Sequence, residues 1–284
     1  MMRRGMVLIP GLILFVYCYL FVQQFKQTQV PLVPLFFQKV EEQALLKPRI
    51  FFRTYANSIF SKAKERIIKE ANGTGWFTSV EGLGPEDLPP MFTEVYKDIL
   101  SLDRGGGYWI WKMAVIEMAM DSMDEGDVLV YVDAGCKINK EGAMLFQEYL
   151  QVLQESPYDM IGFQIGHTEQ KWTTEAIFQA FNVSKDDPIR TTHQIMATSL
   201  FLRKGNHLRQ WLARVNQVLM HDPFLITDKY NGQGKSAYPG FKDNRHDQSI
   251  FSVSRKQMGC ILLPSKQYPP GNATSPIWST RSKG

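Results

Sequence analysis

One carboxylate of this 284-residue chain stands where an α/β sheet would present it to a ligand. The run Val-Leu-Val-Tyr-Val at 128–132 predicts a strand buried on both faces, because its apolar residues do not alternate with polar ones. Asp133 follows directly, and Gly135 allows a sharp turn. Since ligands of open α/β sheets bind outside the carboxyl ends of the strands, Asp133 predicts a site for a divalent metal and, through it, a diphosphate. The alternative is a carboxylate that only caps the turn.

A glycine-rich segment precedes this strand. Three glycines at 105–107 follow Arg104, and Tyr-Trp-Ile-Trp leads from them to Lys112. Glycines let the backbone pass close to a ligand, and the charges of Arg104 and Lys112 would neutralise phosphate oxygens. The alternative is a loop followed by aromatic core residues. The segment matches neither a Walker A sequence nor a GxGxxG fingerprint.

Two further polar segments supply acid and base groups. In the loop 243–249, His246 offers a ring nitrogen to a metal, and Asp247 can orient a hydroxyl or accept its proton. A solvated loop cap is the alternative there. The segment 167–175 gathers polar and aromatic groups that would suit an acceptor sugar, and Glu175 belongs to it. Asp247 and Glu175 are therefore the candidate catalytic residues.

The elements that must position these residues alternate along the chain. Strands are predicted near 49–54, 76–80, 128–132, 160–163, 198–202 and 257–263. Helices are predicted after Asn57, over 91–100, before 123, over 140–154 and over 208–220. This alternation predicts an α/β fold with a mainly parallel central sheet flanked by helices.

Composition and charge exclude some classes of protein. The chain is 44% hydrophobic and 21% charged, as globular proteins are, and its net charge is +4. Because no Lys/Arg cluster alternates with aromatic residues, we expect no nucleic-acid partner. Cys136 and Cys260 either form a disulfide or stay free as buried thiols, and no Cys/His spacing suits structural zinc.

The N-terminal sequence is typical of a membrane anchor. Arginines in the tail 1–4 precede an uncharged apolar stretch at 5–22, which is long enough to cross a membrane and predicts a cytoplasmic N-terminus. A cleaved signal peptide is the rival, although no good cleavage site follows. A stem at 23–47 then leads to a catalytic domain at 48–284. Three glycosylation sequons favour a secretory-pathway lumen: Asn72, Asn182 and Asn272.

Three segments, in this order, resemble a group of GT-A nucleotide-diphospho-sugar glycosyltransferases. They are Gly-Tyr-Trp-Ile-Trp-Lys at 107–112, Tyr-x-Asp-Ala-Gly-Cys at 131–136 and His-Asp-Gln-Ser-Ile-Phe-Ser at 246–252. The resemblance implies a Rossmann-like nucleotide-binding half, a more variable acceptor half, a nucleotide-sugar donor and Mn²⁺ or Mg²⁺. It also implies that the nucleotide base is held after the first strand, by Thr54, Tyr55 and Asn57.

The chain departs from the family pattern at the metal motif. GT-A enzymes carry Asp-x-Asp, and here Asp133-Ala-Gly135 keeps only the first acid. That departure shifts more of the metal binding to His246 and Asp247. The resulting prediction is a type II Golgi glycosyltransferase that moves a hexose to a hydroxyl of a glycan or glycoconjugate. The alternatives are a non-catalytic sugar- or nucleotide-binding module and a metal-dependent hydrolase that uses Asp133, His246 and Asp247.

Overall fold

We describe a computed structural model of the chain over residues 48–232, 238–267 and 269–283. The predicted tail, anchor and stem lie outside these residues. Within them, no helix is both long enough and apolar enough to cross a membrane.

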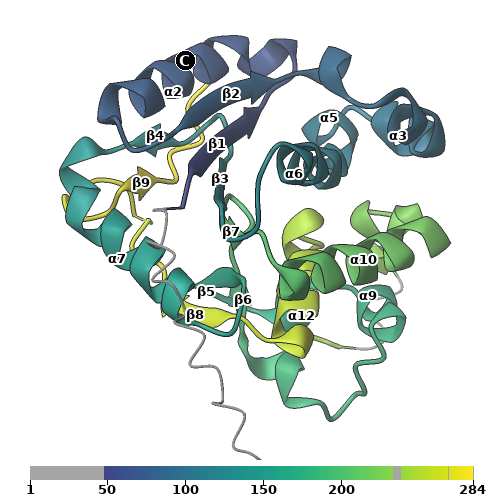
Figure 1. Ribbon diagram of the computed structural model, residues 1–284. Coiled ribbons are helices and arrows are strands. Elements are labelled where there is room, and N and C mark those ends of the chain that lie inside the picture. The colour runs from purple at the N-terminus through teal and green to yellow at the C-terminus, as the bar shows by residue number, and fades with distance from the viewer. Residues whose placement is uncertain (1–47, 233–237, 268, 284) are drawn as a thin grey trace, which may run out of the picture. The chain divides into compact units, whose positions relative to one another are not determined.

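The described residues form one compact unit of alternating strands and helices (Figure 1). The strands are β1 (Ile50–Tyr55), β2 (Ser79–Leu83), β3 (Val128–Val132), β4 (Lys137–Ile138), β5 (Met160–Thr168), β6 (His193–Ile195), β7 (Ser199–Arg203), β8 (Ile261–Pro264) and β9 (Ile277–Trp278). The α-helices are α2 (Ser61–Thr74), α3 (Pro90–Val95), α4 (Lys97–Leu100), α5 (Gly105–Tyr108), α6 (Trp111–Asp121), α7 (Ala143–Glu155), α8 (Glu169–Trp172), α9 (Glu175–Ala180), α10 (Asn206–His221) and α12 (Asp247–Met258). Short 3₁₀ turns include η1 (Ser58–Phe60) and η4 (Pro188–Thr191).

The central sheet has the strand order β2-β1-β3-β7-β5-β6, with β8 on the other edge of β5. The strands β1, β2, β3, β5 and β8 run in one direction, whereas β6 and β7 run the opposite way. The prediction of an α/β fold with a mainly parallel sheet is therefore confirmed in its main part. As a consequence, the carboxyl ends of β1, β3 and β5 lie at the same edge of the sheet, which is where α/β folds bind ligands.

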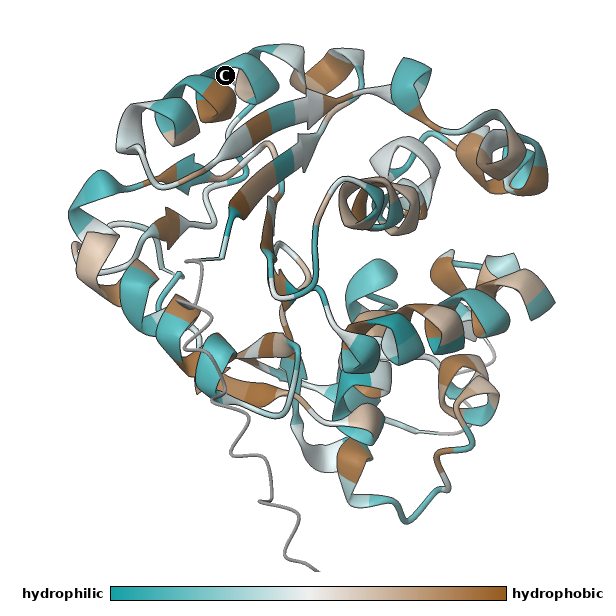
Figure 2. Cartoon of the chain, in the orientation of Figure 1, coloured by the Kyte–Doolittle hydropathy of each residue, from teal (hydrophilic) through white to brown (hydrophobic). Residues whose placement is uncertain are grey.

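Helices cover both faces of this sheet, with α2 and α7 on one side and α6, α10 and α12 on the other (Figure 1). Successive residues of β3 point to opposite faces of the sheet, where they join two separate hydrophobic cores, and all five are buried. Val128, Val130 and Val132 pack toward α2 and α7, while Leu129 and Tyr131 pack toward α6, α10 and α12. In Figure 2 hydrophobic residues recur along the central strands β1 and β3, and α10 carries both hydrophobic and hydrophilic residues, as a helix covering a sheet should.

Several predicted elements are displaced or divided. The second strand lies at Ser79–Leu83 rather than 76–80, and the helix over 91–100 is divided in two at Tyr96. The helix predicted after Asn57 begins as the short turn η1, and α2 follows from Ser61; Ile59 in η1 is 61% exposed. Both described cysteines are free, so of the two alternatives the structure contains the thiols.

Candidate functional site

A buried lysine joins two carboxylates at the edge where β3 ends. The Lys112 ammonium lies 2.5 Å from Asp247 Oδ2 and 3.2 Å from Asp133 Oδ1, and it donates to the Ala197 carbonyl oxygen at 3.0 Å. The ammonium therefore makes two hydrogen bonds and, in addition, an ion pair with Asp133. The Lys112 side chain is only 1% exposed, that of Asp247 is 9% exposed and that of Asp133 is 29% exposed. We call Lys112, Asp133 and Asp247 the Lys112 cluster; Asp133 is the member that a ligand can reach.

The fold assembles this cluster, together with the carbonyl group that Lys112 binds, from four separate places. Lys112 is the second residue of α6, Asp133 follows β3, and Asp247 is the first residue of α12. The carboxylate of Asp247 is favoured there by the dipole at the helix N-terminus. Ala197 lies in the break between β6 and β7, which both pair with β5, and the break turns its carbonyl oxygen toward the ammonium.

Burial alone would lower the pKa of Lys112, but the charges of Asp133 and Asp247 outweigh it and raise the pKa. The lysine is therefore charged at any ordinary pH. Burial, and next the charge of Asp247, raise the pKa of Asp133, while Lys112 and the Tyr131 hydroxyl oppose that rise. One ammonium and two carboxylates leave the Lys112 cluster with a surplus of negative charge.

The sequence analysis missed Tyr131 as a site residue. Its hydroxyl donates to Asp133 Oδ1 at 2.7 Å, although the ring is completely buried. Burial and the charge of Asp133 raise the pKa of Tyr131 well above its usual value, so it stays a donor. The sequence does carry a signal for this contact, because residues two apart along an extended chain lie on the same face, as Tyr131 and Asp133 do.

The glycine-rich segment forms a left-handed turn that delivers Lys112. Gly105, Gly106 and Gly107 have φ values of 62°, 61° and 92°, and Tyr108 and Trp109 continue at 51° and 60°. Left-handed backbone is costly for residues with a side chain, and such strain gathers at functional sites. The strain therefore makes this turn, together with the Lys112 cluster beside it, a candidate for function.

The turn predicts one large effect on stability. A Cβ on Gly107 would lie 2.8 Å from the Cα of Leu100, and φ is positive there. We expect Gly107→Ala to lower the free energy of unfolding by about 2–4 kcal/mol, from backbone strain and overpacking together. Gly166→Ala is the matched control, because nothing lies within 4 Å of the added Cβ. Chemical denaturation measures both; equal effects would show that the turn is not constrained.

His246 packs on this turn. Its own φ is 57°, and its ring stacks on Trp109 at 5.3 Å between centroids and meets Tyr108 edge-on at 5.0 Å. Its Nδ1 lies 2.9 Å from the Ile226 carbonyl oxygen, which can only accept, so Nδ1 carries the proton. Nε2 is buried without a hydrogen-bond partner among the described residues, and Asp228 Oδ1 lies 3.9 Å away.

Burial, and next the charge of Arg104, lower the pKa of His246 below its usual 6.5. His246 of the unfolded chain therefore binds a proton as the pH falls through about 6.5, whereas His246 of the folded chain binds it only at a lower pH. We expect the free energy of unfolding to fall as the pH drops from 6.5 to the lowered pKa of the folded state, and to lose no more from this group below it. Chemical denaturation from pH 7.5 to 5 measures this slope. It should flatten in His246→Gln, and an unchanged slope would contradict the assignment.

The residues expected at the nucleotide lie beside the same turn. Tyr55 stacks on Trp111 at 3.9 Å between ring centroids, and the buried Thr54 Oγ1 has no hydrogen-bond partner among the described residues. Asn57 caps η1, and its amide nitrogen lies 3.2 Å from where a Cβ of Gly106 would be. The strand end and the glycine turn are thus neighbours, and the base-binding roles stay predictions.

Two candidate residues have partners outside the Lys112 cluster. Arg104 donates to Asp228 at 2.7 Å and to Asp243 at 3.4 Å, so its charge is already paired. Glu175, expected to be catalytic, accepts two hydrogen bonds from the Arg190 guanidinium, at 2.6 and 3.0 Å. This pair joins the start of α9 to η4, and the catalytic role of Glu175 stays a prediction.

The turn after Asp133 does not form a metal site of the Asp-x-Asp type. A C-terminal segment, residues 279–282, lies against it: Thr280 Oγ1 and Ser282 N donate to the Gly135 carbonyl at 2.6 and 2.8 Å. A Cβ on Gly135 would lie 3.2 Å from the Cα of Arg281, so an acid has little room at the second position. In the part of the chain that the structure describes, no three His, Cys, Asp or Glu residues are grouped to hold a metal. The residues of the turn after Asp133 therefore do not fit the metal that the family resemblance implies.

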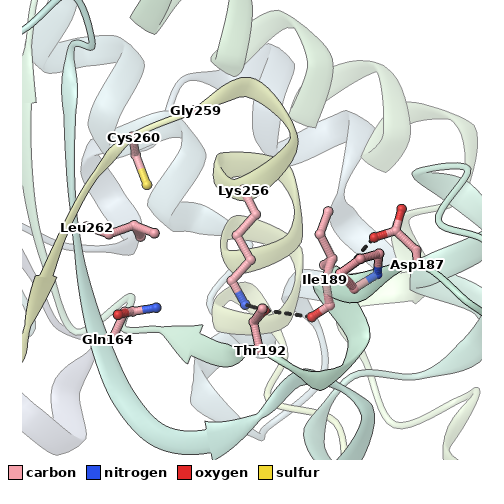
Figure 3. A pocket seen from close by; sticks show the side chains of 9 residues that line it. Gln164, Asp187, Ile189, Thr192, Lys256, Gly259, Cys260 and Leu262 are labelled. Carbon is pink, nitrogen blue, oxygen red and sulfur yellow. Dashed lines mark hydrogen bonds between the residues drawn. The ribbon is translucent and has the colours of Figure 1, made fainter.

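A cavity of about 400 Å³ lies at the other end of α12 (Figure 3). Lys256, Thr192, Cys260 and Gln164 line it, and the Lys256 ammonium is bound to Thr192 Oγ1 and to the buried Glu169. No member of the Lys112 cluster belongs to its lining. The candidate site is therefore the edge of the sheet at Asp133, and not this cavity.

Comparison with known proteins finds similarity in structure but not in sequence. No family model and no curated protein matches the chain. A glycosyltransferase involved in the glycosylation of the major capsid of PBCV-1 is 11% identical, with a TM-score of 0.43 over 81% of this chain and 94% of that one. The apo form of mouse xyloside xylosyltransferase 1 is 11% identical, with a TM-score of 0.39 over 77% of this chain and 84% of that one.

A third structure is the galactosyltransferase LgtC in complex with donor and acceptor sugar analogs. It is 11% identical, with a TM-score of 0.36 over 80% of this chain and 86% of that one. All three are glycosyltransferases. Similarity at this level assigns neither a substrate nor an activity to the chain.

Proposed function

We propose that this chain is a GT-A-type glycosyltransferase that moves a hexose from a nucleotide-diphosphate sugar to an acceptor hydroxyl. One observation carries the proposal: the three segments on which the family resemblance rests meet at one point. Lys112 ends the first segment, Asp133 lies in the second and Asp247 in the third, and the Lys112 ammonium contacts both carboxylates. They meet at the carboxyl edge of the sheet, where α/β folds bind ligands.

The chemistry of the site suits a donor with free hydroxyls. Asp133 is partly exposed and belongs to a cluster with surplus negative charge, so it can accept hydrogen bonds from ribose or sugar hydroxyls, as acids near the strand ends of nucleotide-binding folds do. Lys112 and Tyr131 hold its other oxygen, and this fixes the carboxylate before the donor binds. Asp247 is our candidate for the acid nearest to the reacting carbon. The described residues do not support metal assistance.

The setting of the enzyme is part of the proposal. We expect residues 5–22 to anchor the chain in a Golgi-like membrane, with the domain from residue 48 onward in the lumen. The sequons at Asn72, Asn182 and Asn272 all lie on exposed residues, which suits glycosylation in that compartment.

Nucleotide binding and donor turnover test the proposed function. We expect the melting temperature of the purified chain to rise with one of UDP, GDP or CMP, because a ligand that binds only the folded state stabilises it. The matching nucleotide sugar should then be hydrolysed slowly or transferred. No shift with any of the three, with or without Mn²⁺, would rule the proposal out. Binding without turnover would favour a non-catalytic module, and release of phosphate from simple esters without nucleotide affinity would favour a hydrolase.

A further inference from the structure

A group of positive side chains surrounds Trp172 at the same edge of the sheet as Asp133. Trp172 ends α8, which follows β5 directly. The guanidinium carbon of Arg245 lies 4.0 Å from the centroid of the Trp172 ring, and the Lys242 ammonium lies 5.7 Å from it. The ring of His167 approaches the indole at 5.0 Å between centroids.

These cations lack the partners that other basic residues have. Among the described residues, no ion pair includes Arg245, Lys242 or Arg281, and the buried Arg245 Nε has no hydrogen-bond partner. Most arginines elsewhere pair with carboxylates: Arg49, Arg53, Arg66, Arg104, Arg190, Arg203 and Arg209. Unpaired guanidinium groups beside a candidate site are available to an anion.

Arg281 brings its charge to this group from the far end of the chain. It sits between Thr280 and Ser282, which both hydrogen-bond to Gly135, and its φ is 55°. The Cα of Arg281 therefore lies 3.2 Å from where a Cβ of Gly135, the second position of the missing Asp-x-Asp motif, would be, while Arg281 itself is exposed. Burial lowers the pKa of Arg245 and of His167, and the positive charge of Arg281 lowers the pKa of both further, so Arg281 lies within electrostatic range of the other two groups.

We infer that Arg245 and Arg281 bind the diphosphate of the donor, in place of a metal held by Asp133. This inference rests on the proposed function. Two guanidinium groups can each offer paired N–H donors to phosphate oxygens. Asp133 meanwhile binds hydroxyls, and the charge of Lys112 is already shared by two carboxylates in a side chain that is only 1% exposed. Each part of a nucleotide sugar thus has a group of suitable charge at this edge.

The arrangement also suits the transfer step. The bond from the sugar C1 to the diphosphate oxygen breaks, and its electron pair stays on that oxygen. The acceptor oxygen forms the new bond to C1 and loses its proton to water. The charge that grows on the diphosphate is then offset by Arg245 and Arg281, as preorganised donors do in other enzymes.

Calorimetric titration with inorganic pyrophosphate and with UDP, GDP or CMP, in the presence of a chelator, tests this inference. We expect the wild-type chain to bind pyrophosphate and one nucleotide without metal. Arg245→Gln and Arg281→Gln should each weaken both by about ten- to hundredfold, the range of one charge-assisted interaction. Arg209→Gln is the matched control, because Arg209 pairs with Glu125 near the opposite end of β3. Melting temperatures confirm that each variant is folded.

The outcomes separate this inference from the proposed function. Nucleotide binding that requires Mn²⁺ and is equal in wild type and both variants overturns the inference and leaves the proposed function standing. Pyrophosphate binding that both variants lose, with no nucleotide bound by the wild type, supports the anion site and overturns the proposed function. Loss of binding in Arg209→Gln as well would show a non-specific effect of net charge and would overturn the inference.

Discussion

Lys112→Met should destabilise the chain more than any other single change at the site. The substitution removes the one positive charge that Asp133 and Asp247 share, and the buried Asp247 is then left without a counter-charge. Breaking a buried ion pair from one side costs about 3–5 kcal/mol. Chemical denaturation should therefore show a loss of that size, and donor binding should be lost with it.

A double-mutant cycle makes this prediction specific. Lys112→Met combined with Asp247→Asn removes both charges of the closest pair, so the double variant should be less destabilised than the sum of the two single variants. Lys62→Met is the matched control, since Lys62 is exposed on α2, and it should change stability by less than about 0.5 kcal/mol. Additive losses in the cycle would mean that Lys112 and Asp247 do not interact.

Asp133→Asn should separate function from folding. The amide keeps the size of the side chain and an oxygen for the Tyr131 hydroxyl, and Lys112 and Asp247 remain as a neutral pair. Because Asp133 is partly exposed and its carboxylate is disfavoured by burial, we expect unfolding to change by only about 1 kcal/mol or less. Donor binding should weaken by about ten- to hundredfold, because a charged acceptor of donor hydroxyls is lost.

The measurement is calorimetric titration of the nucleotide sugar together with the rate of its hydrolysis or transfer. Asp98→Asn, on the exposed face of α4, is the control for the loss of one negative charge. Unchanged binding and turnover in Asp133→Asn would remove Asp133 from the site and would leave its carboxylate as a turn cap.

The elements with strong local signals could be predicted from the sequence. β3 lies where its apolar run predicted, and the helix over 208–220 appears as α10 (Asn206–His221). Both depend on patterns within one segment. The three glycines of α5 indicate where the turn lies. The left-handed conformation of Tyr108 and Trp109 could not be predicted, because residues with side chains rarely adopt it.

The contacts that complete the site could not be predicted, since they join distant segments. Nothing near Ala197 in the sequence indicates that its carbonyl oxygen binds a lysine, because any residue has a carbonyl. Arg281 lies far from Gly135 in sequence, and no periodic pattern places the segment 279–282 on that turn. The partners of Lys112 could not be predicted either. Its charge suggested that it binds phosphate, and only the structure shows that its ammonium contacts Ala197, Asp247 and Asp133.

The order of these segments has a consequence for synthesis on the ribosome, where N-terminal parts of a chain can fold first. Lys112 and Asp133 emerge early and can form a neutral pair while the rest of the site is still untranslated. Asp247 joins them much later, and the turn at Gly135 is covered only when residues 279–282 follow. On the inference that Arg245 and Arg281 bind the diphosphate, a nascent chain would hold Asp133 in place before it carries Arg281, and it would gain its full affinity for a diphosphate only once residue 281 has been added.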